Sequence, residues 1–79
     1  MGQLEKLLEK MRRLPPEMRY EEVERVLRAY GFIEKRANGS HHIFRHPDGR
    51  KLTVPKHGGQ VVKTTYLKQV LKVIGEEEE

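Results

Sequence analysis

The spacing of apolar residues changes near Gly31, and this change restricts the possible folds more than any other feature of the chain. Before Gly31 the apolar residues recur every three or four positions, which is typical of amphipathic helices. After it they alternate with polar residues in short segments separated by turn residues, which is typical of strands. The helical spacing returns near Thr64. A chain of 79 residues has room for one domain with one small core.

Two amphipathic helices are predicted before the change. The first covers residues 3–14, and Pro15-Pro16 ends it because proline lacks the backbone N–H that a helix needs. The second covers Tyr20 to Tyr30, and Gly31 suits the position after its C-cap, where a left-handed backbone favours glycine. The apolar stripes of the two helices are Leu4, Leu7, Leu8 and Met11, and Val23, Val26, Leu27 and Tyr30.

Three short strands are predicted next, over residues 32–36, 41–46 and 51–55. Asn38-Gly39 between the first two is a strong hairpin signal, and Pro47-Asp48-Gly49 predicts a second tight turn. Strands joined by such turns pair in the antiparallel direction. Residues 56–63 are predicted as a loop.

A third helix, from about residue 64 to residue 74, completes the predicted order of elements. Thr64 or Thr65 is expected to cap its N-terminus, and its stripe is Leu67, Val70, Leu71 and Ile74. We therefore expect an α+β fold in which two helices pack on one face of a three-stranded antiparallel sheet, with an extra N-terminal helix. The expected divisions are an N-terminal helical extension with its Pro-Pro linker, the main domain and an acidic tail, over residues 1–19, 20–75 and 76–79.

Basic residues are concentrated in the second half of the chain. Residues 31–75 carry nine Lys or Arg against Glu34 and Asp48, and such a surface attracts phosphate backbones. Ordinary solubilising charge would give the same composition. The absence of cysteine excludes a disulfide framework and a thiolate metal site. No apolar run is long enough to span a bilayer and no secretory signal is recognisable, so we expect a cytoplasmic protein without a membrane partner.

Histidines are the side chains best suited to acid–base chemistry near neutral pH, and the chain has four: His41, His42, His46 and His57. Alternation along the second strand puts His41 on one face and Phe44 on the other. If Phe44 packs under the helices, His41 lies on the open face together with Arg45. A neutral imidazole beside a bound phosphodiester can take the proton of a ribose 2′-OH, and nearby cations can stabilise the charge on the phosphate. The plainer interpretation is a polar strand residue without a role.

Other chemistries have little support in the sequence. His42 and His46 are four residues apart on a strand, about 13 Å, which is too far for one metal ion. No nucleotide-binding glycine loop or nucleophile motif is present, so neither a metal nor a small-molecule cofactor is expected. His57 follows Lys56 in the predicted loop, where it could meet His41 as an acid partner or simply be solvated.

Residues 39–50, Gly-Ser-His-His-Ile-Phe-Arg-His-Pro-Asp-Gly-Arg, resemble the signature of HicA toxins. Residues 52–59, Leu-Thr-Val-Pro-Lys-His-Gly-Gly, resemble the next block of that family, and the resemblance covers about residues 20–75. It implies an α-β-β-β-α fold similar to double-stranded-RNA-binding domains, cleavage of mRNA and neutralisation by a partner antitoxin, HicB. It also implies that His41, the histidine after Gly-Ser, is catalytic.

The leading hypothesis is therefore a metal-independent endoribonuclease that uses His41 as general base. The RNA contacts expected for it are Lys35, Arg36, Ser40, Arg45, Lys51, Lys56 and His57. The alternative is a non-catalytic RNA-binding module of the same fold, which has little need of an imidazole at position 41. A third hypothesis gives the helix of residues 3–14 a role in docking or dimerisation, whereas the plainer interpretation is that it covers the core.

Overall fold

A computed structural model of the chain describes residues 2–39, 41–56 and 60–75, with the backbone alone at residues 36–38. Its elements in chain order are α1 (Gln3–Arg12), β1 (Glu17–Arg19), α2 (Tyr20–Ala29), β2 (Ile33–Asn38), β3 (His41–Arg45), β4 (Lys51–Pro55), β5 (Val61–Lys63) and α3 (Thr64–Val73). Strands β2, β3 and β4 form an antiparallel sheet in that order, and β1 pairs with β5 in a second antiparallel sheet. The predicted α+β fold with an extra N-terminal helix is confirmed.

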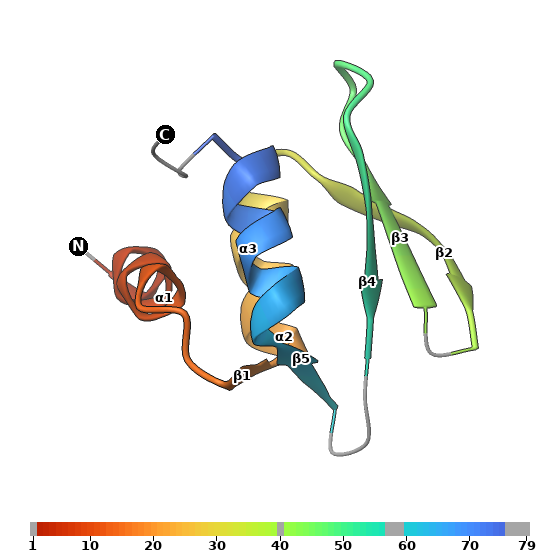
Figure 1. The fold of residues 1–79 in the computed structure, drawn as a ribbon. Helices are drawn as coiled ribbons and strands as arrows, with labels where there is room; N and C mark the ends of the chain where they lie inside the picture. Colours follow the sequence, from red (N-terminus) through yellow and green to blue (C-terminus); the bar gives the residue numbers. More distant parts are fainter. Residues whose placement is uncertain (1, 40, 57–59, 76–79) are drawn as a thin grey trace.

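The helices lie on one side of the three-stranded sheet. Figure 1 shows α2 and α3 beside this sheet, α1 on the side of these helices away from it, and no described element on the outer face of the sheet. Phe44 of β3 and Val54 of β4 are fully buried, so they face the helices. The other fully buried large side chains are Phe32, Met11, Met18, Leu27, Leu67, Val23, Val26, Val62 and Val70. One core therefore joins the sheet to all three helices.

The chain leaves α2 through a turn that requires glycine. Gly31 has a φ of 92°, its N–H donates to the carbonyl of Arg28 (3.0 Å), and the N–H of Phe32 donates to the carbonyl of Leu27 (2.9 Å). This is the Schellman arrangement of a helix C-terminus. A Cβ at position 31 would lie 2.8 Å from Nε2 of His46. Both the backbone conformation and the close approach of His46 therefore explain the predicted glycine.

The turn between β3 and β4 is fixed to the end of α3. The N–H of Gly49, at a φ of 104°, donates to the carbonyl of His46 (2.9 Å). Asp48 accepts hydrogen bonds from the backbone N–H (3.0 Å) and Nε (2.9 Å) of Arg50, and the backbone bond is the main reason that the pKa of Asp48 is lowered. The Arg50 guanidinium also donates to the carbonyl of Val73 at the C-terminus of α3. The predicted tight turn is confirmed, and it is anchored to a helix.

The predicted loop over residues 56–63 is wrong at its end, because Val61–Lys63 form β5. This strand pairs with β1, and backbone bonds from Tyr20 to Gln60 (2.9 Å) and from Thr64 to Pro16 (3.2 Å) close the ribbon. Both strands have three residues, which is too short for alternation to be recognised in the sequence. Their partners are also far apart in the chain, so no local pattern predicts the pairing.

The N-cap of α3 differs from the prediction as well. The cap residue is Lys63, and no side chain caps this helix terminus. The hydroxyl of Thr64 donates instead to the carbonyl of Pro15 (2.5 Å), which ties the start of α3 to the segment after α1. The Thr64 hydroxyl, predicted as a local N-cap, is therefore used in a long-range hydrogen bond instead.

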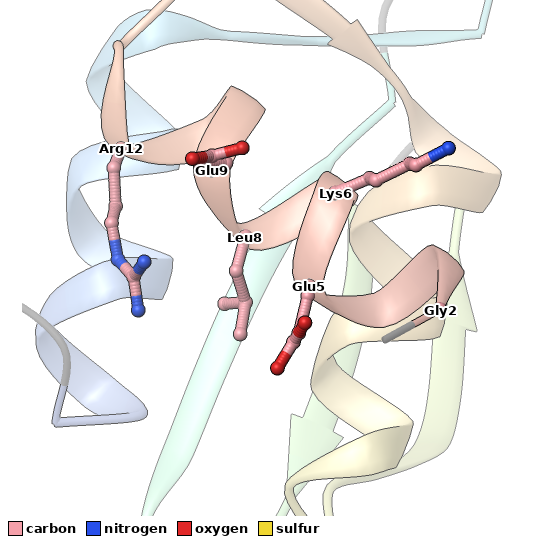
Figure 2. Close-up of a pocket in the computed structure, with 6 residues that line it drawn as sticks. All are labelled: Gly2, Glu5, Lys6, Leu8, Glu9 and Arg12. Carbon is pink, nitrogen blue, oxygen red and sulfur yellow. The ribbon is translucent and has the colours of Figure 1, made fainter.

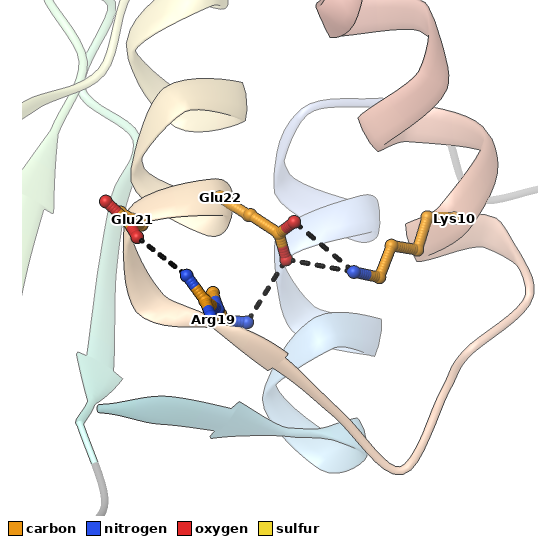
Figure 3. A network of polar contacts seen from close by, with 4 residues as sticks. All are labelled: Lys10, Arg19, Glu21 and Glu22. Carbon is orange, nitrogen blue, oxygen red and sulfur yellow. Dashed lines mark hydrogen bonds and ion pairs between the residues drawn. The ribbon is translucent and has the colours of Figure 1, made fainter. Parts of the chain in front are cut away.

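Helix α1 is attached to the core and to α2. Met11 is fully buried and Leu8 is nearly so. At the edge, Lys10 pairs with Glu22 (3.1 Å), which also accepts a bond from the backbone N–H of Arg19 (3.2 Å) at the start of α2. Figure 3 shows this network of Lys10, Arg19, Glu21 and Glu22 at the junction of the helices. Packing therefore determines the position of α1, and exposed ion pairs of this kind add little.

Candidate active site

His41 is the first residue of β3 and is exposed. Its backbone pairs with Asn38 of β2 and Pro55 of β4. Because Phe44 is buried under the helices, alternation places His41 on the outer face together with Ile43 and Arg45. The expected exposure of this imidazole on the open face of the sheet is confirmed, and its catalytic role stays a prediction.

Cations gather at the other end of the same face. Ile33, Arg45 and Lys51 lie opposite one another on the three strands, and a register shift between Glu34 and Arg36 places Lys35 beside them. A shallow hollow at this end is lined by Ile33, Lys35, Arg45, His46, Pro47 and Gly49. We call it the Ile33 recess.

The predicted RNA-contacting residues do not form one cluster around His41. Arg45 is four residues along the same strand, so about 13 Å separates its Cα from that of His41. Lys56 lies against α2, with its Nζ 4.5 Å from the ring centroid of Tyr20. Arg36 pairs through its backbone with Ile43. Two further predicted contacts, Ser40 and His57, lie outside the described residues.

A polar cluster between β2, β3 and α2 was not found from the sequence. Nδ1 of His42 lies 2.8 Å from Oε2 of Glu34, and the hydroxyl of Tyr20 donates to Oε1 of Glu34 (3.0 Å). The rings of Tyr20 and His42 are 4.7 Å apart. The side chains of His42 and Glu34 are only 13% and 24% exposed. The sequence offers one signal for the cluster, which is that Glu34 is one of two acids in a basic region.

The cluster shifts the pKa of two of its members. The hydrogen bond with His42 is the main cause that lowers the pKa of Glu34, and the bond from Tyr20 adds to it. Burial and the neighbouring Glu34 raise the pKa of Tyr20 above its usual value. A charged Glu34 is therefore stabilised between these two side chains, and it holds the first half of β3 against α2.

A sequence comparison decides the family. The family described as HicA toxin of bacterial toxin-antitoxin matches residues 20–76, which is most of the chain. The chain belongs to the HicA toxin family. It is therefore a toxin of a toxin–antitoxin pair whose partner is a cognate antitoxin, and membership supports nuclease activity at the level of the family. No curated protein matches the chain closely enough to be compared with it.

The HicA match begins at the first residue of α2 and includes the exposed His41, the Ile33 recess and the Tyr20–Glu34–His42 cluster. Helix α1 lies before it. A hollow on α1, drawn in Figure 2, is lined by side chains of both charges, Glu5, Lys6, Glu9 and Arg12, together with Gly2 and Leu8. This hollow lies outside the family match and offers no single charge to a ligand.

Two further results concern the described part of this HicA chain. No group of three or more His, Asp or Glu within it is arranged to hold a metal ion. None of its helices combines the length and the apolar character that crossing a bilayer requires.

The lowered pKa of Glu34 predicts a pH-dependent stability. Its carboxylate stabilises the fold at pH values above 4.5, the usual pKa of glutamate, and this contribution is lost as the pH falls through the lower pKa of the folded state. We expect Glu34→Gln to cost about 1–3 kcal/mol at pH 7, because hydrogen bonds to a charged group are replaced by neutral ones. The cost should shrink as the pH falls below 4.5, and urea unfolding at several pH values measures it.

The matched control is Glu21→Gln on α2, where the side chain is 71% exposed. Its effect on the free energy of unfolding should be small at every pH, since exposed ion pairs contribute little. If the two variants had the same pH dependence, the cluster would not stabilise the charged form of Glu34.

Proposed function

We propose that this HicA toxin is a metal-independent endoribonuclease that cleaves mRNA, with the His41 imidazole as general base and a HicB-type antitoxin as its cytoplasmic partner. The observation that carries the proposal is the exposed His41 on a sheet face that no described element covers. The other described side chains of that face include Arg45 and Lys51, and none of them is acidic. Such a face attracts a phosphate backbone and leaves the imidazole accessible to it.

The chemistry of the proposal follows from the imidazole of His41. Neutral imidazole takes the proton of a ribose 2′-OH, and the 2′-oxygen attacks the adjacent phosphorus atom. The bond from phosphorus to the 5′-oxygen of the next nucleotide breaks, and that oxygen takes up a proton from the imidazolium or from water. The products are a 2′,3′-cyclic phosphate and a 5′-hydroxyl. DNA is spared because it lacks the 2′-OH.

The cations act at a distance from the reacting phosphate in this proposal. Lys35, Arg45 and Lys51 bind phosphates further along the RNA, because about 13 Å of strand separates Arg45 from His41. The remaining predicted RNA contacts keep their role in the proposal: Arg36, Ser40, Lys56 and His57.

A single 2′-deoxy substitution tests the chemistry. The purified protein is incubated in chelator with an RNA that it cleaves and with the same RNA carrying 2′-deoxyribose at the cleaved position. We expect cleavage of the first RNA to a cyclic phosphate and no cleavage of the second at that position. Cleavage that stops in chelator, or that ignores the 2′-deoxy substitution, would contradict the mechanism.

The second candidate function is RNA binding without catalysis. The separation between the cations and His41 favours it, because Lys35, Arg45 and Lys51 can bind RNA without any contribution from the imidazole. It predicts salt-sensitive binding from which intact RNA is recovered. The same incubation distinguishes the two functions, since only a nuclease leaves cyclic phosphate ends.

A further inference from the structure

The Ile33 recess combines an exposed apolar side chain with a positive rim. Ile33 is 52% exposed and is the one large apolar side chain that the described chain leaves open to solvent. Pro47 and Gly49 of the β3–β4 turn border the same hollow, and Lys35 and Arg45 supply its charge. Its volume of about 460 Å³ is within the range of small-ligand pockets.

The cations at the recess have no counter-charge among the residues that the structure describes. Within the described ranges, no side-chain hydrogen bond or ion pair joins Lys35, Arg45 or Lys51 to another residue. Arg45 and Lys51 stand directly opposite each other on neighbouring strands, and like charges in that position destabilise a sheet. Five other cations of the described chain do pair with carboxylates: Lys10, Arg19, Arg28, Arg50 and Lys63. An arrangement that costs stability and leaves three cations free is suited to an external anion.

We propose that the Ile33 recess is a nucleotide subsite that binds RNA at a distance from the cleaved bond. The base packs against Ile33 and Pro47 and stacks on the planar guanidinium of Arg45, while Lys35 and Lys51 contact the phosphates on either side. This inference rests on the proposed function, because it takes His41 as the cleavage point.

The distance between His41 and the Ile33 recess determines how long an RNA must be to contact both. Arg45 and His41 are separated by about 13 Å along β3. A stacked strand rises about 3.4 Å per nucleotide, so the subsite holds a nucleotide on the order of four positions from the cleaved bond, or fewer if the strand is extended. An RNA that ends before the recess can still be cleaved, although more slowly.

We favour RNA over a protein partner as the ligand because His41 and the Ile33 recess lie on one face of the sheet. Ile43 of β3 and Thr53 of β4 lie opposite each other between His41 and the recess, and both are uncharged. Neither introduces a negative charge along the path of a phosphate backbone. An acidic segment of the antitoxin would meet the same cations, and the experiment below separates that outcome.

The experiment compares a short and a long RNA that contain the same cleaved dinucleotide, the long one extending about five nucleotides on both sides. A third RNA has the long length with abasic residues at the outer positions. We expect the wild type to cleave the long RNA about tenfold more efficiently, as kcat/KM, than the short or the abasic RNA. Ile33→Ser should remove most of this preference without slowing cleavage of the short RNA, and Lys51→Ala should also remove most of it.

Lys68→Ala is the matched control, because Lys68 is an exposed cation on α3, away from the outer face of the sheet. It should keep the wild-type preference. Thermal unfolding of each variant checks that Ile33→Ser folds, and Lys51→Ala, which removes only an exposed cation, tests the subsite independently.

Two results would overturn the subsite while the nuclease proposal stands. The first is equal cleavage of the three RNAs by the wild type, and the second is an unchanged preference in both recess variants. If the recess variants keep the RNA preference but are no longer neutralised by the antitoxin, the recess binds the protein partner instead of RNA. If the wild type cleaves no RNA, the nuclease proposal fails. The recess is then tested by binding of the long and abasic RNAs, and equal affinity for the two would contradict the subsite.

Discussion

His41→Ala is expected to slow RNA cleavage by about 10²–10⁴-fold, the usual contribution of a positioned general base. The side chain is exposed at the start of β3, and its removal leaves no buried polar group without a partner. The free energy of unfolding should therefore stay within about 0.5 kcal/mol of the wild-type value, as for most surface substitutions. RNA binding should persist, because Arg45 and Lys51 remain in place.

Single-turnover cleavage of one defined RNA measures this effect, with binding to the same RNA as the second readout. Thr53→Ala is the control, because Thr53 lies on the same outer face, is exposed and cannot titrate near neutral pH. Added imidazole should restore part of the lost rate in His41→Ala, since the base is small and its position is open to solvent. A variant that cleaves as fast as the wild type would remove His41 from the mechanism.

Much of the fold follows from local patterns in the sequence. The stripe of α2 is buried as expected at Val23, Val26 and Leu27, because helical spacing is a property of neighbouring residues. Alternation along β3 likewise separates buried Phe44 from exposed His41. The outward position of the candidate base could therefore be predicted once one core residue of the strand was known.

The parts that were missed depend on contacts between distant residues. Strand β5 needs β1 as its partner, and Lys63 and Glu17, which join the two strands, are 46 positions apart. The Tyr20–Glu34–His42 cluster joins three elements, and its members are ordinary strand and helix residues when taken one at a time. No periodicity brings such residues together, since the pairing is decided by how the elements pack.

The distribution of charge along the sheet could not be predicted from the sequence either. Composition shows that the region after Gly31 is basic, and alternation shows which residues share a face. Neither shows that Arg45 and Lys51 lie in one cross-strand row, because the register depends on the turn geometry and on the irregularity near Lys35. Of the predicted cations, Arg45 and Lys51 lie in a row at the other end of β3 from His41.

The second large effect concerns α1, which lies before the HicA match at residues 20–76. Met11→Ala is expected to reduce the free energy of unfolding by about 2–5 kcal/mol, as for other large-to-small core substitutions. Met11 is fully buried in the same core cluster as Phe44 and Leu67, and truncation would leave a cavity that the surrounding helices cannot fill. A domain of 79 residues has a total stability of only about 4–12 kcal/mol, so the variant would be close to unfolding at 37 °C.

Urea unfolding of Met11→Ala and of Lys6→Ala makes the comparison within one helix. Lys6 is exposed on α1, and its substitution should change the stability by less than about 0.5 kcal/mol. A large effect at Met11 alone means that α1 is part of the folded unit, so an antitoxin could not displace it without unfolding the toxin. A small effect at Met11 would mean that α1 is only loosely attached, and a partner could then take its place on α2 and α3.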